Sequence, residues 1–221
     1  MHFTNVIIFG ASGDLGNSFI KVLLSKSERI TLVVRNVSKL NQEVIEMPHV
    51  STVEFNFPSQ LKKLENHLDK ENTHFDLIVN AVGAYDQSKD ILNVDHFESL
   101  ICSNFSVLQY ILAALKPYMF KDSKFINISS IASHSGSPSE TAYSSSKLLV
   151  DNLMASLRFD DTYKIVRTLN VRPGAIVSKM TSTRVDSSKF IDPEELANLC
   201  LEIISSGNSI NVPSIDIYRR F

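Results

Sequence analysis

Seven short apolar runs, separated by helical patterns, constrain the fold of this chain more than any other feature of its sequence. The runs lie at 6–9, 30–34, 53–55, 75–80, 124–129, 164–171 and 215–218. Between them, the spacing of apolar residues predicts helices at about 15–26, 59–70, 96–116, 141–159 and 193–206. Strands buried on both faces read as continuous apolar runs, and alternating strands and helices build a parallel sheet with helices on both faces. We therefore predict an α/β fold with a doubly wound parallel sheet of about seven strands.

Length and composition predict a single domain over residues 1–221. The chain is 43% hydrophobic, which is enough for a sizeable core, and no tract of linker composition divides it. Its net charge of −2 argues against a nucleic-acid surface. We find no apolar run close to the roughly 20 residues of a membrane span, and the N-terminus lacks the pattern of a signal peptide. We expect a cytoplasmic protein with no nucleic-acid or membrane partner.

The cysteines and histidines show no pattern typical of a metal site. Cys102 and Cys200 both fall in apolar helical patterns, so we expect two buried free thiols, consistent with a reducing compartment. The six histidines form no pair with ligand spacing, and we assign no metal. His134, close after Ser130, either lines a substrate pocket or is a solvated loop residue.

A glycine-rich loop follows the first apolar run and opens the first predicted helix. It offers candidate dinucleotide contacts at Gly10, Ser12, Gly13, Asp14, Leu15 and Gly16. Glycine lets the backbone approach a pyrophosphate, and the helix N-terminus supplies N–H groups and a favourable dipole. This strand–turn–helix context predicts a Rossmann-like, dinucleotide-binding domain. The alternative is a tight turn in an α/β protein that binds no ligand there.

The end of the second run distinguishes between the two nicotinamide dinucleotides. A site for NAD usually has an acidic residue there, which binds the ribose 2′-hydroxyl. This chain has Arg35 instead, whose guanidinium suits the 2′-phosphate of NADP. We therefore favour NADP over NAD, with a solvated arginine as the alternative. After the fourth run, Asn80, Ala81 and Gly83 form either a turn that packs on the adenosine ribose or an ordinary turn.

Tyr143 and Lys147 carry the clearest chemical signal in the sequence. In a helix over 141–159 they lie on one face, one turn apart, and Ser130 precedes them. A neighbouring cation favours the phenolate, so we expect a tyrosine pKa below its ordinary value of about 10. Such a phenol transfers protons near neutral pH, while the serine hydroxyl binds the same substrate oxygen. The three residues predict an acid/base site for interconverting a carbonyl and an alcohol.

The predicted helix at 96–116 is apolar all round, so only one of its faces can meet the sheet. A second copy of the chain is the simplest cover for the rest, which predicts a homodimer or homotetramer. The alternative cover is the chain's own loops. Asn104, in the middle of this helix, must satisfy its amide. It bonds either to a carbonyl one turn away or, at a helix bulge, to a water near Lys147.

Together these residues resemble the short-chain dehydrogenase/reductase family over nearly the full length of the chain. The resemblance rests on the glycine loop at 10–16, NAVG at 80–83, Asn104, NISS at 127–130, YSSSK at 143–147 and RPG at 172–174. It implies that Tyr143 is the general acid/base and that Ser130 orients the carbonyl. It also implies that Lys147 holds the ribose hydroxyls and lowers the tyrosine pKa, and that Asn104 anchors a water in the proton relay. Contacts to the nicotinamide end are implied for Pro173, Gly174, Ile176 and Ser178.

Four departures from the family pattern affect this prediction. The loop reads GxxGxxG, a spacing more typical of the extended, sugar-nucleotide branch than of single-domain members. The turn reads NAVG where NNAG is usual. The acid common after the third strand is replaced by Asn56, which weakens the adenine contact expected from Asn56 and Phe57. The C-terminus lacks the glycine-rich ending of many tetrameric relatives, which makes a dimer the safer expectation than a tetramer.

The sequence thus predicts an NADP(H)-dependent oxidoreductase that acts on a small-molecule carbonyl or alcohol. Two alternatives stay open: a non-catalytic NADP-binding regulatory or sensor protein, and a nucleotide-sugar epimerase or dehydratase. The sequence does not indicate the substrate. We expect the segment after Gly83 and the loop at 178–192 to shape its pocket, with the loop as a lid.

Overall fold

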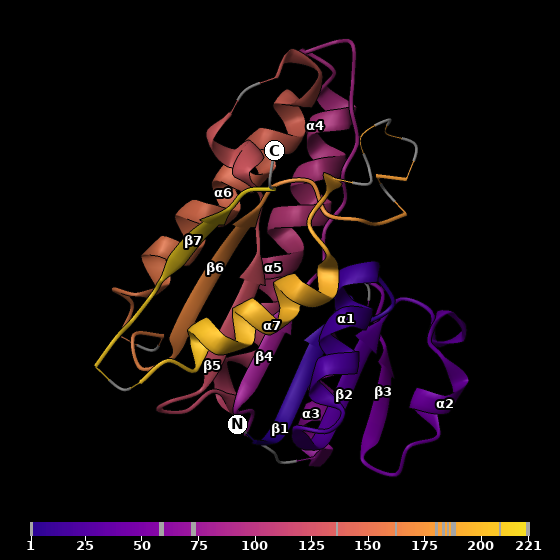
Figure 1. Cartoon of the computed structure of the whole chain (residues 1–221), viewed down its shortest axis with the longest axis vertical. Coiled ribbons are helices and arrows are strands. Elements are labelled where there is room, and N and C mark those ends of the chain that lie inside the picture. The colour runs from indigo at the N-terminus through magenta and orange to yellow at the C-terminus, as the bar shows by residue number, and fades with distance from the viewer. Residues whose placement is uncertain are drawn as a thin grey trace.

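The computed structural model describes residues 2–57, 60–71, 74–135, 137–161, 163–179, 181–182, 184, 186, 189–207 and 209–219. Within these residues the strands are β1 (Phe3–Phe9), β2 (Ser27–Val34), β3 (Val50–Glu54), β4 (Leu77–Asn80), β5 (Lys124–Ile128), β6 (Arg167–Pro173) and β7 (Ser214–Ile217). They form one seven-stranded sheet in the order β3-β2-β1-β4-β5-β6-β7, parallel throughout (Figure 1). The prediction of a doubly wound parallel sheet is confirmed.

Helices cover both faces of this sheet. They are α1 (Asp14–Leu23), α2 (Gln42–Ile45), α3 (Leu61–Glu71), α4 (Val94–Leu100), α5 (Val107–Leu115), α6 (Thr141–Leu157) and α7 (Pro193–Ile204). Buried side chains of α1 and α7 join one hydrophobic cluster, and those of α3, α5 and α6 join a second one. Alternate residues of β1 point to the two clusters: Val6 and Ile8 to the first, Ile7 and Phe9 to the second. Figure 1 shows α1 and α7 in front of the sheet and α5 behind it.

The helix predicted at 96–116 departs from a regular α-helix in its middle. Between α4 and α5 the backbone forms a π-helix, Ile101–Ser106, and α5 continues as a 3₁₀ turn, Lys116–Tyr118. A π-helix holds one extra residue per turn and is frequent at functional sites. This π-helix contains Asn104, which is 3% exposed.

Cys102 corrects one of the sequence predictions. It lies in the π-helix and is exposed, whereas Cys200 in α7 is buried as expected. Burial raises the pKa of the Cys200 thiol to about 12. The expectation of two buried thiols assumed a regular helix, and a π-helix changes which residues face the core.

A second correction concerns membrane spans. The continuous helical stretch Val94–Tyr118 is long and apolar enough, by length and composition, to cross a bilayer. In this fold its α5 part packs on the sheet through Val107, Leu108, Ile111 and Leu112. Much of the apolar character of the stretch Val94–Tyr118 therefore comes from residues that pack in the core.

Part of the predicted exposed apolar face of 96–116 is covered by the chain itself. Six of the nine residues of α5 are buried. Tyr110 on α5 is 39% exposed, and Leu148 and Leu149 on α6 are 53% and 38% exposed. The oligomeric state therefore stays a prediction, with these apolar side chains as its remaining support.

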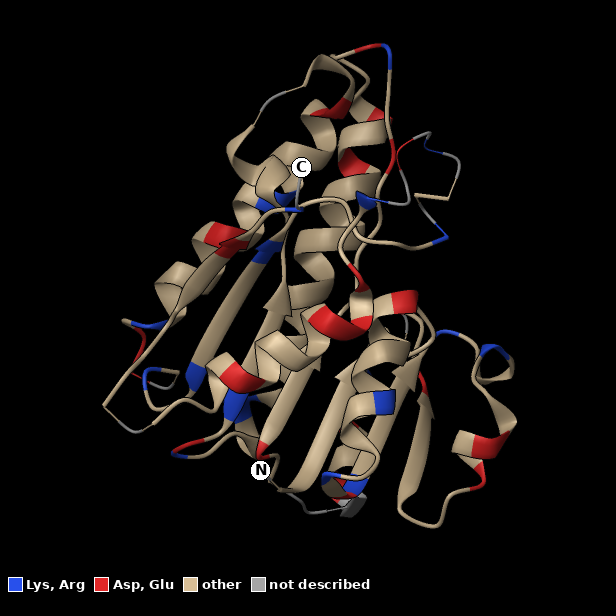
Figure 2. Ribbon diagram, viewed as in Figure 1, with Lys and Arg blue, Asp and Glu red and all other residues tan. Residues whose placement is uncertain are grey.

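Charged residues are dispersed over the elements that Figure 2 shows. In this view of the described residues, Lys and Arg occur singly on several helices, strands and loops, with no stripe of basic side chains along one element. Acidic residues are prominent on α7, which begins with Glu194 and Glu195 behind the capping residue Asp192. Acidic residues at a helix N-terminus interact favourably with the helix dipole, so these charges have a local structural role.

The turn between β1 and α1 yields a stability prediction. A Cβ at Gly16 would lie 2.2 Å from the carbonyl oxygen of Gly10, whereas a Cβ at Gly207 would meet no atom within 4 Å. Overpacking of this kind typically costs about 1–3 kcal/mol. We expect Gly16→Ala to lower the free energy of unfolding by about that amount, and Gly207→Ala to change it by less than about 0.5 kcal/mol. Urea denaturation measures both, and equal stability of the two variants would contradict the packing described here.

Candidate active site

A cavity of about 480 Å³ opens where the carboxyl ends of the central strands meet. Ligands of doubly wound folds bind at this edge of the sheet. The cavity is lined by predicted site residues from five separate segments of the chain: Gly13, Asp14, Leu15, Gly16, Ala81, Gly83, Ser130, Tyr143, Lys147, Pro173, Gly174, Ile176 and Ser178. The fold therefore brings the glycine loop and the tyrosine–lysine pair to the same cavity.

The glycine loop places the N-terminus of α1 at this cavity. Gly10 has a left-handed backbone, with φ at 74°, and Gly16 packs directly on its carbonyl. Gly13 is the capping residue of α1 and no side chain caps the helix, so its first N–H groups are available to a ligand. The carboxylate of Asp14 accepts a hydrogen bond of 2.7 Å from the backbone N–H of Lys179. The free N–H groups at the start of α1 are donors that suit a pyrophosphate.

Ser130, Tyr143 and Lys147 form one wall of the cavity. Tyr143 and Lys147 lie one turn apart on α6, as predicted, and Ser130 follows β5. The Ser130 hydroxyl lies close enough to the Tyr143 phenol to lower the pKa of that phenol. Lys147 is only 4% exposed; its Nζ donates to the Ile128 carbonyl at 3.2 Å and lies 6.0 Å from the centre of the Tyr143 ring.

The pKa of Tyr143 is shifted in the direction opposite to our expectation. Burial raises it above the ordinary value of 10.0, the Ser130 hydroxyl lowers it in part, and the charge of Glu140 adds to the rise. The expectation of a lowered pKa considered the lysine charge and neglected desolvation, which favours the neutral phenol. In this protein without a bound ligand, Tyr143 is therefore protonated at neutral pH.

The buried lysine carries the complementary shift. Burial lowers the pKa of Lys147 from 10.5 to about 8, and the negative charge of Asp151 acts in the opposite direction. Desolvation penalises an ammonium strongly, and only its polar surroundings keep it charged. At pH 7 the lysine is mostly protonated and titrates close to physiological pH.

The protein partners of Asn104 are Ala84 and Ser146, and not the carbonyl one turn away. Its Oδ1 accepts from the Ala84 N–H at 2.8 Å, and its Nδ2 donates to the Ala84 carbonyl at 3.0 Å and to Ser146 Oγ at 2.9 Å. The predicted bulge is present as the π-helix, and the amide does not bond to a carbonyl one turn away. The water near Lys147 stays a prediction. The Asn104 amide fixes the segment after β4 against α6. A Cβ at Gly83, in that segment, would lie 3.2 Å from both Asn104 Oδ1 and Lys147 Nζ.

Several predicted contacts lie away from the cavity wall. Asn80 is buried in β4, where its Oδ1 accepts from the Val82 N–H at 3.2 Å. Gly10 lies beneath the loop, and Ser12 on it is exposed. Arg35 is exposed directly after β2, whose Val33 carbonyl accepts from the Gly10 N–H at 3.1 Å. The arginine is thus next to the glycine loop, and its role toward a 2′-phosphate stays a prediction.

The residues expected to contact adenine lie beyond β3. Asn56 is exposed, and its backbone N–H donates to Gln60 Oε1 at 3.0 Å. Phe57 is half-buried, with its ring 4.6 Å from that of Tyr110. His134 is likewise outside the cavity lining, with 56% of its side chain exposed, which fits the solvated alternative.

Sequence reasoning missed a tyrosine–glutamate pair on the open side of Tyr143. The Tyr85 hydroxyl donates to Glu140 Oε1 at 2.6 Å, and the Tyr85 ring lies edge-on to that of Tyr143 with centroids 4.9 Å apart. Both residues line the cavity. Burial, helped by Glu140, raises the pKa of Tyr85. The sequence offered one sign of this pair, which is the position of its members: Glu140 directly precedes α6, and Tyr85 closely follows Gly83.

The expectation that the loop at 178–192 shapes the pocket is met by its described residues. Ser178, Thr181 and Arg184 line the cavity, while 180, 183, 185, 187 and 188 lie outside the described residues. Arg219, from the segment after β7, also lines it and pairs with Asp186 of the loop. Sequence reasoning missed this contribution, because only the topology shows that the chain returns to the cavity after β7.

Comparison with known proteins decides the family. The family model for short chain dehydrogenases matches residues 4–189, a range that includes the glycine loop, Ser130, Tyr143 and Lys147. The chain belongs to the short-chain dehydrogenase/reductase family. It is accordingly an enzyme and an oxidoreductase, as the resemblance implied.

Individual relatives of this short-chain enzyme are distant but cover most of its length. An uncharacterized oxidoreductase of Staphylococcus epidermidis is 24% identical over 222 residues, covering 96% of this chain and 95% of the relative. Carbonyl reductase family member 4 of Xenopus laevis is 26% identical over 219 residues, covering 90% of each. A short chain dehydrogenase from Burkholderia cenocepacia, solved in complex with NADP, superimposes with a TM-score of 0.80 at 19% identity, covering 100% of this chain and 89% of that one. The structural likeness supports the fold.

The buried ammonium of Lys147 generates a prediction on stability. The unfolded chain holds this proton up to pH 10.5, and the folded chain only up to about 8. Below pH 8 both states are protonated and the charge is buried at full cost; between pH 8 and 10.5 the folded state has released the proton, so the cost diminishes. Lys147→Met should therefore raise the free energy of unfolding at pH 7, by up to about 3 kcal/mol. This gain should shrink from pH 8 upward.

Urea denaturation from pH 6 to 10 measures the effect. Lys62→Met is the matched control, since the Lys62 side chain is 81% exposed, and it should change stability by less than about 0.5 kcal/mol at every pH. A Lys147→Met gain that is absent, or that does not vary with pH, would show that the ammonium is well compensated in the folded state.

Proposed function

We propose that this short-chain enzyme interconverts a carbonyl and an alcohol by hydride transfer with NADP(H), with Tyr143 as the acid/base. The observation that carries the proposal is that Ser130, Tyr143 and the buried Lys147 line the same cavity, with the lysine one turn along the helix from the tyrosine. The name of the Xenopus relative, a carbonyl reductase family member, supports the same reaction class.

The cavity suits a nicotinamide dinucleotide at positions that these residues define. The uncapped N-terminus of α1 would hold the pyrophosphate, and Lys147 would hold the ribose hydroxyls. Arg35, beside the glycine loop and exposed, would bind the 2′-phosphate, which favours NADP over NAD. The complex of the Burkholderia relative with NADP is consistent with this choice. When bound, the nicotinamide supplies or accepts the hydride.

The protein's own residues then handle the substrate oxygen and the proton. The Ser130 hydroxyl and the Tyr143 phenol both line the cavity, so a carbonyl oxygen that enters between them would be held by two donors. Because burial keeps the phenol protonated, Tyr143 starts in the form that gives a proton to the developing alkoxide. Carbonyl reduction is therefore the direction that matches the protonation state at neutral pH. Alcohol oxidation would need the phenolate and should require higher pH.

We also propose that the enzyme acts in the cytoplasm as a homodimer. Two free cysteines are consistent with a reducing compartment. The exposed apolar side chains Tyr110, Leu148 and Leu149, on α5 and α6, would supply a second copy's contact. Sedimentation of the purified chain would test the dimer.

Tyr143→Phe tests the assignment of the acid/base. The change deletes the hydroxyl and keeps the ring, including its edge-on packing with Tyr85. General acid catalysis is typically worth about 10²–10⁴-fold, so we expect kcat to fall at least about 10²-fold with little change in NADPH affinity. The measurement is NADPH oxidation against a panel of ketones and aldehydes, alongside NADPH titration by fluorescence. Wild-type binding of NADPH without turnover of any carbonyl would favour the sensor alternative.

Arg35→Ala tests the choice of cofactor. Loss of a charge-assisted hydrogen bond costs about 1.5–3 kcal/mol, so NADPH affinity should fall roughly tenfold to a hundredfold while NADH affinity stays nearly constant. Arg29→Ala is the matched control, because Arg29 is exposed at the opposite end of the same strand. Titration of both cofactors against the three proteins measures this. A wild-type preference for NADH, or equal loss of both cofactors, would contradict the role of Arg35.

A further inference from the structure

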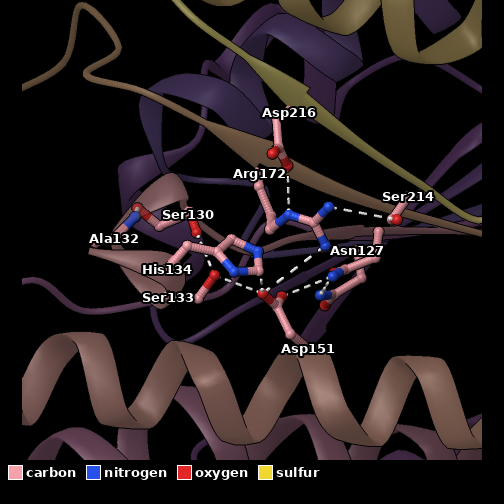
Figure 3. A network of polar contacts seen from close by, with 10 residues as sticks. Asn127, Ser130, Ala132, Ser133, His134, Asp151, Arg172, Ser214 and Asp216 are labelled. Atoms are coloured by element: carbon pink, nitrogen blue, oxygen red, sulfur yellow. Dashed lines mark hydrogen bonds and ion pairs between the residues drawn. The ribbon is translucent and has the colours of Figure 1, made fainter. Parts of the chain in front are cut away.

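Asp151 is a nearly buried carboxylate behind the proposed catalytic residues. It lies on α6 one turn after Lys147, and its side chain is 10% exposed. Its Oδ2 lies 2.5 Å from Ser133 Oγ, and its Oδ1 accepts from Asn170 Nδ2 at 2.7 Å. Figure 3 shows it where side chains from β5, β6 and the turn Ile131–His134 converge. A buried carboxylate costs desolvation free energy unless hydrogen bonds or an opposite charge compensate for it.

We propose that Asp151 is a positioning residue of this active site: through Ser133 it fixes the turn that presents Ser130, and it supplies the counter-charge to the Lys147 ammonium. The inference rests on the proposed function, because it concerns the same three catalytic residues. Asp151 itself does not line the cavity.

The link to Ser130 runs through one short turn. Ser130 is the capping residue of the turn Ile131–His134, and its Oγ accepts from the Ala132 N–H at 3.1 Å. Ser133 lies in that turn; its N–H donates to the Ser130 carbonyl at 3.1 Å, and its Oγ reaches both this carbonyl, at 2.9 Å, and Asp151. The carboxylate thus anchors the turn to α6, the helix that carries Tyr143. Small displacements of a catalytic group can cost large factors in rate, so this anchor has a catalytic consequence.

A directed chain of hydrogen bonds across the sheet ends at the same carboxylate. Asn80 Nδ2 donates to Asn127 Oδ1, Asn127 Nδ2 donates to Asn170 Oδ1, and Asn170 Nδ2 donates to Asp151, at 2.8, 2.8 and 2.7 Å. Each amide donates in the same direction, so the chain needs an acceptor at its end. An ionised carboxylate only accepts, which makes aspartate the suitable terminus. Aligned bonds of this kind polarise one another, and this chain holds Asp151 in a fixed orientation.

Three basic side chains lie around Asp151, and Lys147 is the most buried of them. His134 Nε2, from the turn, lies 3.8 Å away and belongs to a mostly exposed side chain. Arg172 NH1, from β6, lies 3.9 Å away, but its Nε binds Asp216 of β7 at 2.5 Å. Residues at i and i+4 of a helix have Cβ atoms about 5–6 Å apart, which places Asp151 next to Lys147.

The lysine depends on this neighbour because its other partners are neutral. Its Nζ donates to the Ile128 carbonyl and lies beside Gly83 and the Asn104 amide, and Tyr143 on its own helix is a protonated phenol. Burial lowers the pKa of Lys147 to about 8, and Asp151 opposes that shift. Without the carboxylate the ammonium would lose its proton at still lower pH.

Asp151→Asn separates charge from geometry. The asparagine Oδ1 can accept from Asn170 while its Nδ2 donates to Ser133 Oγ, since a hydroxyl both donates and accepts. The variant therefore keeps both hydrogen bonds and removes the negative charge, which also faces His134 and Arg172. Ser133→Ala does the reverse, because it keeps the carboxylate and removes the anchor of the turn. Asp216→Asn is the control for the surrounding charges, because it removes a carboxylate that is connected to Asp151 only through Arg172 in the described network.

Two quantities are measured for each variant. The first is the titration midpoint of Lys147 Nζ, observed by ¹⁵N NMR in the protein without ligand and assigned by its absence in Lys147→Met. The second is kcat for the best carbonyl of the panel with NADPH at saturation. We expect Asp151→Asn to lower the lysine midpoint by about one pH unit. Ser133→Ala should leave the midpoint in place and reduce kcat roughly tenfold or more. Asp216→Asn should change neither.

The two halves of the proposal fail separately. An unchanged lysine midpoint in Asp151→Asn overturns the counter-charge, and an unchanged kcat in Ser133→Ala overturns the positioning of Ser130. Should Asp151→Asn not fold, Asp151→Ser replaces it as a smaller neutral acceptor for Asn170, with the same expected midpoint shift. If the wild type turns over no carbonyl, the proposed function fails, while the lysine titration still decides whether Asp151 provides the counter-charge.

Discussion

Burial of the Lys147 ammonium is the constraint on which the rest of this site depends. A charge with only 4% exposure must be surrounded by polar groups, and each neighbour is constrained accordingly. Position 83 is a glycine, where a Cβ would lie 3.2 Å from the ammonium nitrogen. The Ile128 carbonyl at the end of β5 is turned to the lysine and accepts its hydrogen bond. The buried cation thus accounts for the glycine at position 83 and for the orientation of the Ile128 carbonyl.

The asparagine in the π-helix belongs to the same arrangement. Asn104 must reach over to Ala84 and Ser146, and the extra residue of the π-helix places its side chain there at 3% exposure. The bonds hold the segment after β4 close to α6, so that Gly83 and Tyr85 stay beside Lys147 and Tyr143. A regular helix would satisfy the backbone equally well, which suggests that the site, rather than the fold, requires the irregular turn.

Much of the fold follows from the sequence, because burial on both faces of the sheet leaves a direct mark on it. Every predicted strand run overlaps an observed strand, and helix α6 lies where the apolar pattern at 141–159 predicts it. The irregular turn at Ile101–Ser106 could be raised from the sequence only as one alternative for Asn104, because residues on every side of that helix are apolar and the helical period is hidden. The wrong expectation for Cys102 has the same origin. Helical phase assigned from a regular period does not hold across a π-helix.

The sequence predicts the part of the candidate site whose residues lie in one motif. It does not predict the part that depends on how neighbouring strands pair and how α6 packs on them. Tyr143 and Lys147 share a helix, so their spacing sufficed. Asn127 and Asn170 bond because β5 and β6 pair in that register, and Asp151 meets them only through the packing of α6. The direction of the tyrosine pKa was also beyond the sequence, because it depends on desolvation, which the fold determines.

The spacing of the loop glycines can now be explained without reference to the substrate. Gly10 needs its left-handed backbone for the turn after β1, and Gly16 lies so close to it that a Cβ would meet the Gly10 carbonyl at 2.2 Å. Both requirements come from the junction of β1, α1 and the turn after β4. The GxxGxxG spacing, which favoured a nucleotide-sugar enzyme, therefore reports on packing at this junction. Residues outside the glycine loop, such as Tyr85, Glu140 and Arg184, line the rest of the cavity and are available to select the substrate.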